Sequence, residues 1–244
     1  MQRLDERKEN ILDFIVRDYI RGAFPISSGR IFKGLELGVS PATIRNIMLE
    51  LGSEDFLEQP HTSSGRVPTD KAYRYFVDYL MEERQPGGKV EEVISELAHE
   101  VHKRHELLFE HLGRTMARHL RLFTGIARFG EGAKSGGFGL SEVLNNPEFE
   151  DHEMAVEFAR LADNLEKIAE SYRNASSFNE AEVFIGEENP FPRGRAFGAV
   201  SLRFADKELR EWLVFSLGPK RMDYEGTSSF LNFTVRDIMG EPRG

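Results

Sequence analysis

The most constraining feature of this sequence is a short amphipathic helix with a well-marked start. Ser40 and Pro41 are typical of a helix beginning, with the serine as N-cap and the proline in the first turn, where its missing N–H costs nothing. The apolar residues that follow recur at spacings of three and four and give the helix one buried face: Ile44, Ile47, Met48 and Leu51. The polar residues between them therefore project away from the core.

The segments around this helix predict a small domain of known type. The apolar spacing predicts helices over residues 5–21 and 28–35, with a turn between the second of them and Ser40. Residues 56–59 predict a short strand, and the turn-rich loop 60–69 leads back to a second one. A further helix starts at Thr69. This order of elements predicts a winged helix-turn-helix over residues 1–84.

The segment Gln85-Pro86-Gly87-Gly88-Lys89 is the clearest linker in the chain. It divides residues 1–84 from residues 90–244, for which we predict an α+β domain. In that second part we expect a long charged helix over 90–122, a glycine-rich loop or strand edge over 125–139, helices over 140–145, 153–173 and 230–239, and antiparallel strands over 182–185, 196–204 and 211–217.

The net charge of −9 argues against a general nucleic-acid coat, because non-specific affinity comes from neutralised phosphates. Residues 1–84 contain 12 Lys and Arg against 14 Asp and Glu, so a DNA interface there depends on local arrangement. The chain has no cysteine, no apolar run long enough for a membrane span and a charged N-terminus. We therefore expect a cytoplasmic protein.

The exposed side of the capped helix has the chemistry of a recognition helix. Asn46 suits a bidentate bond to adenine, Arg45 suits guanine or phosphate, and the methyl group of Thr43 suits thymine. Ser40 lies at the same helix end and completes this candidate set. The alternative is a solvated helix face with an Arg–Glu pair.

The loop of the predicted hairpin contains hydrogen-bond donors and no acidic residue between Gln59 and Thr69. Hydroxyls and an arginine beside open backbone N–H groups suit phosphate oxygens. The candidate phosphate contacts are His61, Thr62, Ser63, Ser64 and Arg66, followed at helical spacing by Lys71 and Arg74. The alternative is an ordinary polar hairpin.

Five histidines fall in the predicted long helix: His99, His102, His105, His111 and His119. Their spacing beside Glu106 would admit a divalent metal or a pH sensor, but a charged helix of this composition is commonly only solvated and there is no HExxH arrangement, so we predict no metal site. Gly136-Gly137-Phe138-Gly139 lacks the lysine of a phosphate loop, and neither a nucleophile elbow nor a thiol is present. We predict no enzyme activity and no cofactor.

Two segments of the first domain, LGVSPATIRN (37–46) and LEQPHTSSGRVPTDK (57–71), resemble the HrcA-type heat-inducible transcription repressors of bacteria. The segments 137–149, VFIGEEN (183–189) and LGPKRMDY (217–224) are similar to the C-terminal part of that family. The resemblance implies a homodimer that represses chaperone genes by binding an inverted-repeat operator. It also implies release of the operator on heat stress, when the chaperonin GroEL no longer supports the active state.

This sequence differs from the family pattern between Leu122 and Gly137, where only a short glycine-rich stretch is present. Family members have a GAF-like second domain with an inserted dimerising segment there. We therefore expect a reduced GAF-like domain that lacks half of its sheet and has a small core. The helix over 90–122 is then the expected dimer contact. The alternative function is a winged-helix regulator whose C-terminal domain senses a small molecule.

Overall fold

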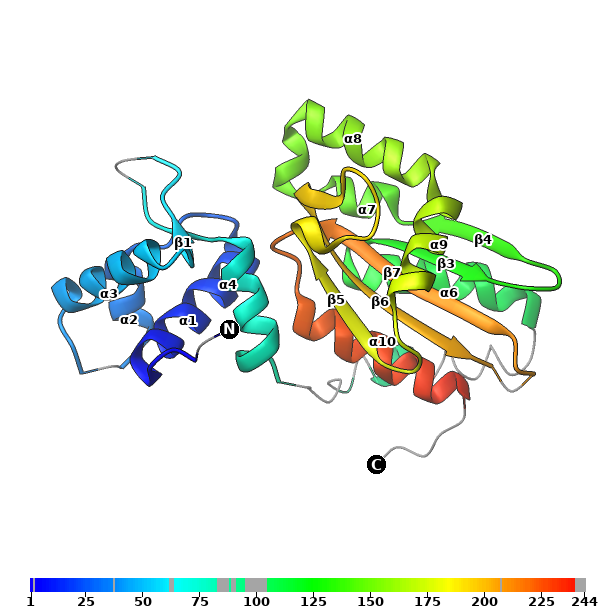
Figure 1. Ribbon diagram of the computed structural model, residues 1–244, viewed down its shortest axis with the longest axis horizontal. Helices are drawn as coiled ribbons and strands as arrows, with labels where there is room; N and C mark the ends of the chain where they lie inside the picture. Colours follow the sequence, from blue (N-terminus) through cyan, green and yellow to red (C-terminus); the bar gives the residue numbers. More distant parts are fainter. Residues whose placement is uncertain are drawn as a thin grey trace. The chain divides into compact units, whose positions relative to one another are not determined.

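The computed structural model describes residues 1, 3–36, 38–61, 64–82, 88, 91–94, 105–206 and 208–239. The chain divides into two compact units, residues 1–82 (unit 1) and residues 83–244 (unit 2). Figure 1 shows both. Of the predicted linker 85–89, all but Gly88 lie outside the described residues.

Unit 1 has the predicted elements in the predicted order. They are α1 (Glu6–Gly22), α2 (Ser28–Gly34), α3 (Pro41–Ser53), the antiparallel strands β1 (Leu57–Glu58) and β2 (Val67–Pro68), and α4 (Asp70–Tyr75), which continues as the π-helical turn η1 (Phe76–Leu80).

Each helix of unit 1 begins at a side chain that accepts hydrogen bonds from the first turn. Such caps satisfy N–H groups that have no partner inside the helix. The predicted cap Ser40 is confirmed, because its Oγ accepts from the N–H of Thr43. The other caps are Asp5 for α1, Ser27 for α2 and Thr69 for α4. Local sequence thus fixes where all four helices start.

The core of unit 1 forms where the apolar faces of its helices meet. The side chains of Ile15, Ile31 and Ile44, from three different helices, have no exposed surface. Two polar links connect the helices at the edge of this core. Asp18 pairs with Arg30, with 2.9 Å between Oδ1 and Nη2, and the hydroxyl of Tyr75 donates to Glu9 at 2.6 Å.

Unit 2 is an α+β fold around a five-stranded antiparallel sheet in the order β4-β3-β7-β6-β5. The strands are β3 (Phe123–Arg128), β4 (Lys134–Phe138), β5 (Ala181–Ile185), β6 (Phe197–Ala205) and β7 (Glu211–Pro219). The helices are α6 (His105–Leu120), α7 (Leu140–Leu144), α8 (His152–Asp163), α9 (Leu165–Ala175) and α10 (Tyr224–Met239), with short 3-10 turns η2 (Pro147–Glu150), η3 (Gly186–Glu188) and η4 (Gly194–Ala196).

The main core of unit 2 lies between the sheet and the helices α8 and α9. Phe158 of α8 and Tyr172 of α9 are fully buried against Phe197 and Phe215 of the sheet. The helices α6 and α10 also pack on the sheet, α6 along β3 and β4 and α10 along β5 and β6. Within the described residues, no helix combines the length and apolar character that a bilayer crossing requires.

The glycine-rich stretch 125–139 forms strands, and the expectation of a half sheet with a small core is wrong. A β-carbon at Gly125 would overlap the ring of Phe215, and one at Gly137 would lie 2.5 Å from the ring of Phe123. Gly125 and Gly137 thus make room for aromatic side chains, whereas Gly130 and Gly132 lie in the turn between β3 and β4 with positive φ. These glycines allow β3 and β4 to complete the sheet.

Three predicted helices of unit 2 have clearly different bounds from those expected, and one of them, predicted over 230–239, starts at Tyr224 as α10. The helix predicted over 153–173 is two helices, α8 and α9, which meet at Asn164. The helix predicted over 90–122 is helical at 91–94 and 105–120, and its residues 95–104 lie outside the described residues. The predicted strands over 182–185, 196–204 and 211–217 correspond to β5, β6 and β7.

Candidate nucleic-acid interface

Helix α3 presents a rigid N-terminus. The hydroxyls of Ser40 and Thr43 lie 3.0 Å apart, and Ser40 also caps the backbone of Thr43 at 3.2 Å. Ile44, Met48 and Leu51 are buried and fix the helix to the domain. The Ser40 cap and the buried face of α3 therefore hold the first turn of the helix, and with it the backbone that carries the exposed side chains.

The outer face of α3 carries the predicted base-reading residues. Arg45 and Asn46 are exposed, and Thr43 is half-buried. Within the part of the chain that the structure describes, the side chains of Arg45 and Asn46 form no hydrogen bond or ion pair. The Arg–Glu pair of the alternative interpretation is therefore not formed. Leu49 lies on the same side with 52% of its surface exposed and adds an apolar contact.

The hairpin loop is built by its own hydrogen bonds. Gln59 donates from its amide to the carbonyl of Ser64 at 3.0 Å, and the Ser64 hydroxyl lies 2.7 Å from the carbonyl oxygen of His61. His61 is exposed, whereas Ser64 is half-buried and shapes the turn. Thr62 and Ser63 lie outside the described residues. The loop projects from unit 1 beside α3 (Figure 1).

A backbone bridge anchors this hairpin to the entrance of α2. Ile26 and Arg66 exchange both of their backbone hydrogen bonds, at 2.8 and 2.9 Å. The Arg66 side chain is half-buried and lies near Gly52 of α3. The bridge was not predicted, because a single isoleucine after Pro25 gives no strand pattern.

The two basic residues of α4 are engaged within unit 1. The ammonium of Lys71 donates to the backbone carbonyl of Glu54 at 2.6 Å and lies over the ring of Phe56, 4.5 Å from its centre. Arg74 pairs with Asp78 at 3.2 Å. Lys71 thus stabilises the C-terminus of α3, where a cation favours the exposed carbonyls. Both residues lie on a helix other than the one that holds Arg45 and Asn46.

Helix α2 contributes one cation that the sequence analysis did not single out. Lys33 is exposed, and within the described residues its ammonium forms no ion pair. Arg30, on the same helix, is held by Asp18 and by the ring of Phe24, 4.5 Å from its centre. The first helix of a helix-turn-helix crosses the DNA backbone. The place of Lys33 on that helix was therefore the sequence signal that could have identified it as a candidate phosphate contact.

Two carboxylates at the helix contacts of unit 1 are stabilised in their charged form. Hydrogen bonds from the Arg30 guanidinium lower the pKa of Asp18 below its ordinary value. The hydrogen bond from Tyr75 lowers the pKa of Glu9. Burial, together with that bond to Glu9, raises the pKa of Tyr75 to about 12. These groups hold the domain together and lie away from the outer face of α3.

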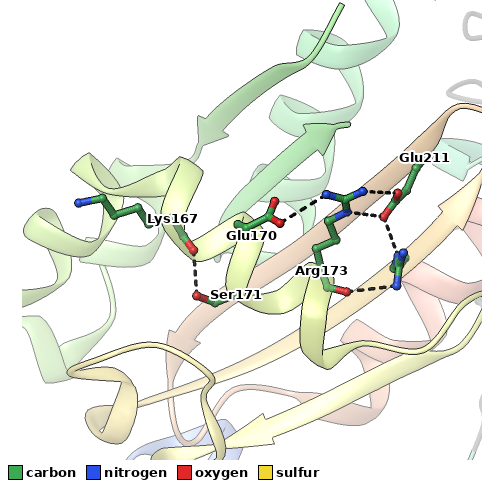
Figure 2. A network of polar contacts seen from close by, with 6 residues as sticks. Lys167, Glu170, Ser171, Arg173 and Glu211 are labelled. Atoms are coloured by element: carbon green, nitrogen blue, oxygen red, sulfur yellow. Dashed lines mark hydrogen bonds and ion pairs between the residues drawn. The ribbon is translucent and has the colours of Figure 1, made fainter. Parts of the chain in front are cut away.

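Unit 2 contains a compact polar network around Glu211, which Figure 2 shows. The carboxylate accepts from Arg173 at 2.8 Å through both of its oxygens and from Arg203 at 2.7 Å. Arg203 also donates to the carbonyl of Arg173, and hydrogen bonds from both arginines lower the pKa of Glu211. All three charges are paired, so this network joins α9 to the sheet.

The histidines of α6 form no metal centre in the described part of the chain, which contains no group of three or more His, Asp or Glu able to hold an ion. His119 stacks on Phe230 with 4.8 Å between ring centres, and burial lowers the pKa of His119. His99 and His102 lie outside the described residues.

A comparison with protein-family models matches residues 70–227 to the model described as the HrcA protein C terminal domain. Curated proteins named heat-inducible transcription repressor HrcA align with part of the chain. That of Pelotomaculum thermopropionicum is 51% identical over 92 residues, which is 38% of this chain and 26% of the relative. That of Carboxydothermus hydrogenoformans is 54% identical over 91 residues, 37% of this chain and 27% of the relative. These alignments thus span about a quarter of each relative.

Among solved structures, a crystal structure of a hypothetical protein matches with a TM-score of 0.76 and 16% sequence identity. The match covers 97% of this chain and 98% of that one. At this identity the likeness concerns the fold alone.

Proposed function

Because the family model matches more than half of its residues, the chain belongs to the HrcA family, and we propose that it is a heat-inducible transcription repressor that acts by occupying operator DNA. The proposal includes no chemical step. Curated relatives carry that name, and two of them align with over a third of this chain at about half identity.

Unit 1 is the proposed DNA-binding domain, a winged helix-turn-helix with α3 as recognition helix and the β1–β2 hairpin as wing. The observation that carries this assignment is the outer face of α3. Exposed Arg45 and Asn46 have no partner among the described residues, and the buried face of a capped helix holds them in place. Their donors are therefore free to meet base edges in a major groove.

The remaining candidate residues are proposed to contact the DNA backbone. Exposed His61, the loop hydroxyls and Arg66 lie on the wing, and Lys33 lies on α2. For Lys71 and Arg74 a phosphate contact would be added to the bonds they already form. Ser40 is proposed to contribute mainly as the cap of the recognition helix.

Unit 2, with its five-stranded sheet, is proposed to be a GAF-like domain that supplies dimerisation and the response to heat. An inverted repeat is read by two winged helices related by a two-fold axis, so the active species is a homodimer in the cytoplasm. A chaperonin such as GroEL is the proposed partner that maintains its folded form.

Nuclease footprinting tests the function directly. We expect the protein to protect an inverted repeat upstream of its own gene or of chaperone genes, with half-sites separated by whole helical turns. Protection is expected to disappear on heating and to need a higher protein concentration in the Asn46→Ala variant. The proposal would be contradicted if neither heating nor Asn46→Ala altered protection of the site. It would also be contradicted if no sequence were protected at low salt.

A further inference from the structure

Helix α6 and the residue that follows it carry three exposed arginines. Arg114 and Arg118 are four residues apart and so lie on one side of α6, and Arg121 comes directly after the end of the helix, with a φ of 56°. None of them forms an ion pair with a residue in the described ranges. Three uncompensated guanidinium groups stand out in a chain with a net charge of −9.

A fourth cation, Lys134, lies beside these arginines over one of two packed aromatic rings. Phe109 of α6 and Phe138 of β4 pack edge to face, with 5.8 Å between ring centres. The ammonium of Lys134 lies 4.5 Å from the centre of the Phe109 ring, and the guanidinium of Arg114 lies 5.9 Å from that of Phe138. Both cations are thus fixed over one pair of rings. We define the basic surface as Arg114, Arg118, Arg121 and Lys134.

An acidic turn lies where η2 meets α8. Glu150, Asp151 and Glu153 are all exposed. Asp151 caps α8, with its carboxylate 2.8 Å from the N–H of Glu153. The carboxylates of Glu150 and Glu153 form no ion pair with any residue that the structure describes. This turn therefore offers uncompensated negative charge.

The basic surface and the acidic turn approach each other at the C-terminus of α6. The carbonyl of Arg121 accepts a hydrogen bond from the side chain of Asn146 at 3.4 Å, four residues before Glu150. Gly139 lies directly against Ala117 of α6, and a β-carbon there would overlap that side chain. Leu140, the next residue, leaves 37% of its surface exposed. The basic surface, exposed Leu140 and the acidic turn thus belong to segments that contact one another, and together they form one surface of unit 2.

We infer that this surface is a two-fold interface with a second copy of the chain, in which the basic surface of each protomer faces the acidic turn of the other. A two-fold contact requires one self-complementary surface, and adjacent patches of opposite charge satisfy that requirement. A DNA backbone would suit the arginines but would be repelled by Glu150 and Glu153. The inference rests on the proposed function, because it supplies the homodimer that reads an inverted repeat.

Charge reversal followed by mixing tests the interface in the full-length protein. Sedimentation or light scattering is expected to show that Arg118→Glu and Glu153→Arg each raise the dimer dissociation constant, on the order of tenfold or more, because like charges then face each other. Mixing the two variants is expected to restore a heterodimer. In that heterodimer one contact has both charges swapped and the other is native. A misfolded variant would not be rescued in this way.

The control is the same reversal elsewhere on unit 2, at exposed Glu166 and Arg193, which we expect to leave the dimer unchanged. Raised salt is expected to weaken the wild-type dimer. The inference is overturned if both interface variants remain dimers. If they also lose affinity for DNA of any sequence, the arginines contact the DNA backbone instead. A wild-type chain that is monomeric even on its operator would contradict the proposed function itself.

Discussion

The backbone of Gly65 packs directly on the backbone of Ile26, so closely that a β-carbon at Gly65 would lie 2.8 Å from the nitrogen of Ile26 and would overlap its carbonyl group. Only glycine fits there. The contact sits beside the hydrogen bonds that Ile26 exchanges with Arg66. The position of the hairpin loop relative to α2 therefore depends on a missing side chain.

Replacing Gly65 is expected to destabilise unit 1. In Gly65→Ala the new methyl group meets backbone atoms, which cannot move aside without breaking the bridge between Ile26 and Arg66. We expect a loss of about 2 kcal/mol in the free energy of unfolding, measured by urea titration. The matched control is Gly29→Ala on α2, where the nearest atom to a β-carbon is 4.0 Å away. Equal stability of both variants would refute this account of the hairpin.

Most of unit 1 could be predicted because its signals are local. Ser40 and Pro41 mark the start of α3, and the spacing of Ile44, Met48 and Leu51 defines its buried face within one turn or two. The bridge at Ile26 could not be predicted, since it joins positions forty residues apart by backbone atoms alone. The bond from the Lys71 ammonium to the carbonyl of Glu54, seventeen residues away, escaped prediction because it too forms only when separate elements pack together.

Unit 2 was predicted less well because its glycines have a tertiary role. Gly125 and Gly137 suggest a loop by composition, yet each occupies a strand position where the aromatic ring of a residue on the adjacent strand takes up the space of a side chain. The apolar pattern also gives no sign of the break at Asn164, because it continues from α8 into α9. The periodicity of apolar residues identifies the buried face of a helix or strand, but it does not identify which aromatic side chains will pack on that face.

The outer face of α3 is expected to determine operator affinity. Asn46→Ala and Arg45→Ala each remove an exposed side chain that forms no hydrogen bond or ion pair with the described residues of unit 1, so the fold should be unchanged. We expect each to weaken operator binding by about 1–3 kcal/mol, the worth of a bidentate base contact. Gel-shift titration with a melting control measures both quantities. Arg7→Ala, at an exposed position of α1, is the matched control. Operator binding equal to wild type in both α3 variants would exclude these residues from the interface.

The cations of the wing and of α4 are expected to act differently. Arg66→Ala and Lys71→Ala should each weaken binding to every DNA sequence by a similar factor. Each should also reduce the magnitude of the slope of log affinity against log salt by about one unit. Lys71→Ala should also lower the free energy of unfolding by about 1 kcal/mol, because the carbonyl of Glu54 loses its donor. A stability change in Lys71→Ala with no change of slope would restrict Lys71 to its structural role.

Unit 1 is expected to lose stability in acid through Asp18. Hydrogen bonds from Arg30 lower the pKa of Asp18 in the folded state below its unfolded value. Folding is therefore favoured at pH values above the unfolded pKa, and this contribution is lost as the pH falls through the folded pKa. In urea titrations the wild type should exceed Asp18→Asn in stability near neutral pH, and the difference should shrink towards acid. A pH-independent difference would mean that the charge of Asp18 does not matter.

The response to heat is expected to depend on two buried hydroxyls in α10. Within the described residues, Ser228 Oγ and Thr234 Oγ1 are buried without a hydrogen-bond partner. A buried hydroxyl without a partner costs about 1–3 kcal/mol, which is a large part of the stability of a typical domain. Unit 2 is therefore expected to unfold at a lower temperature than unit 1. Operator release should accompany that first transition, and added chaperonin should reverse it.

Removing these hydroxyls should make the repressor less sensitive to heat. Thr234→Val keeps the shape of the side chain and Ser228→Ala removes only the hydroxyl oxygen. Both delete an unsatisfied group, so each should raise the melting temperature of unit 2 by about 2–4 °C per kcal/mol gained. The temperature of operator release should rise with it. Ser171→Ala is the control, because that hydroxyl already donates to the carbonyl of Lys167 at 2.9 Å, and its loss should bring no gain (Figure 2). Calorimetry beside a binding assay separates the outcomes. If melting shifts upward while release stays at the original temperature, heat is sensed outside α10, and a ligand-controlled release becomes the better account of unit 2.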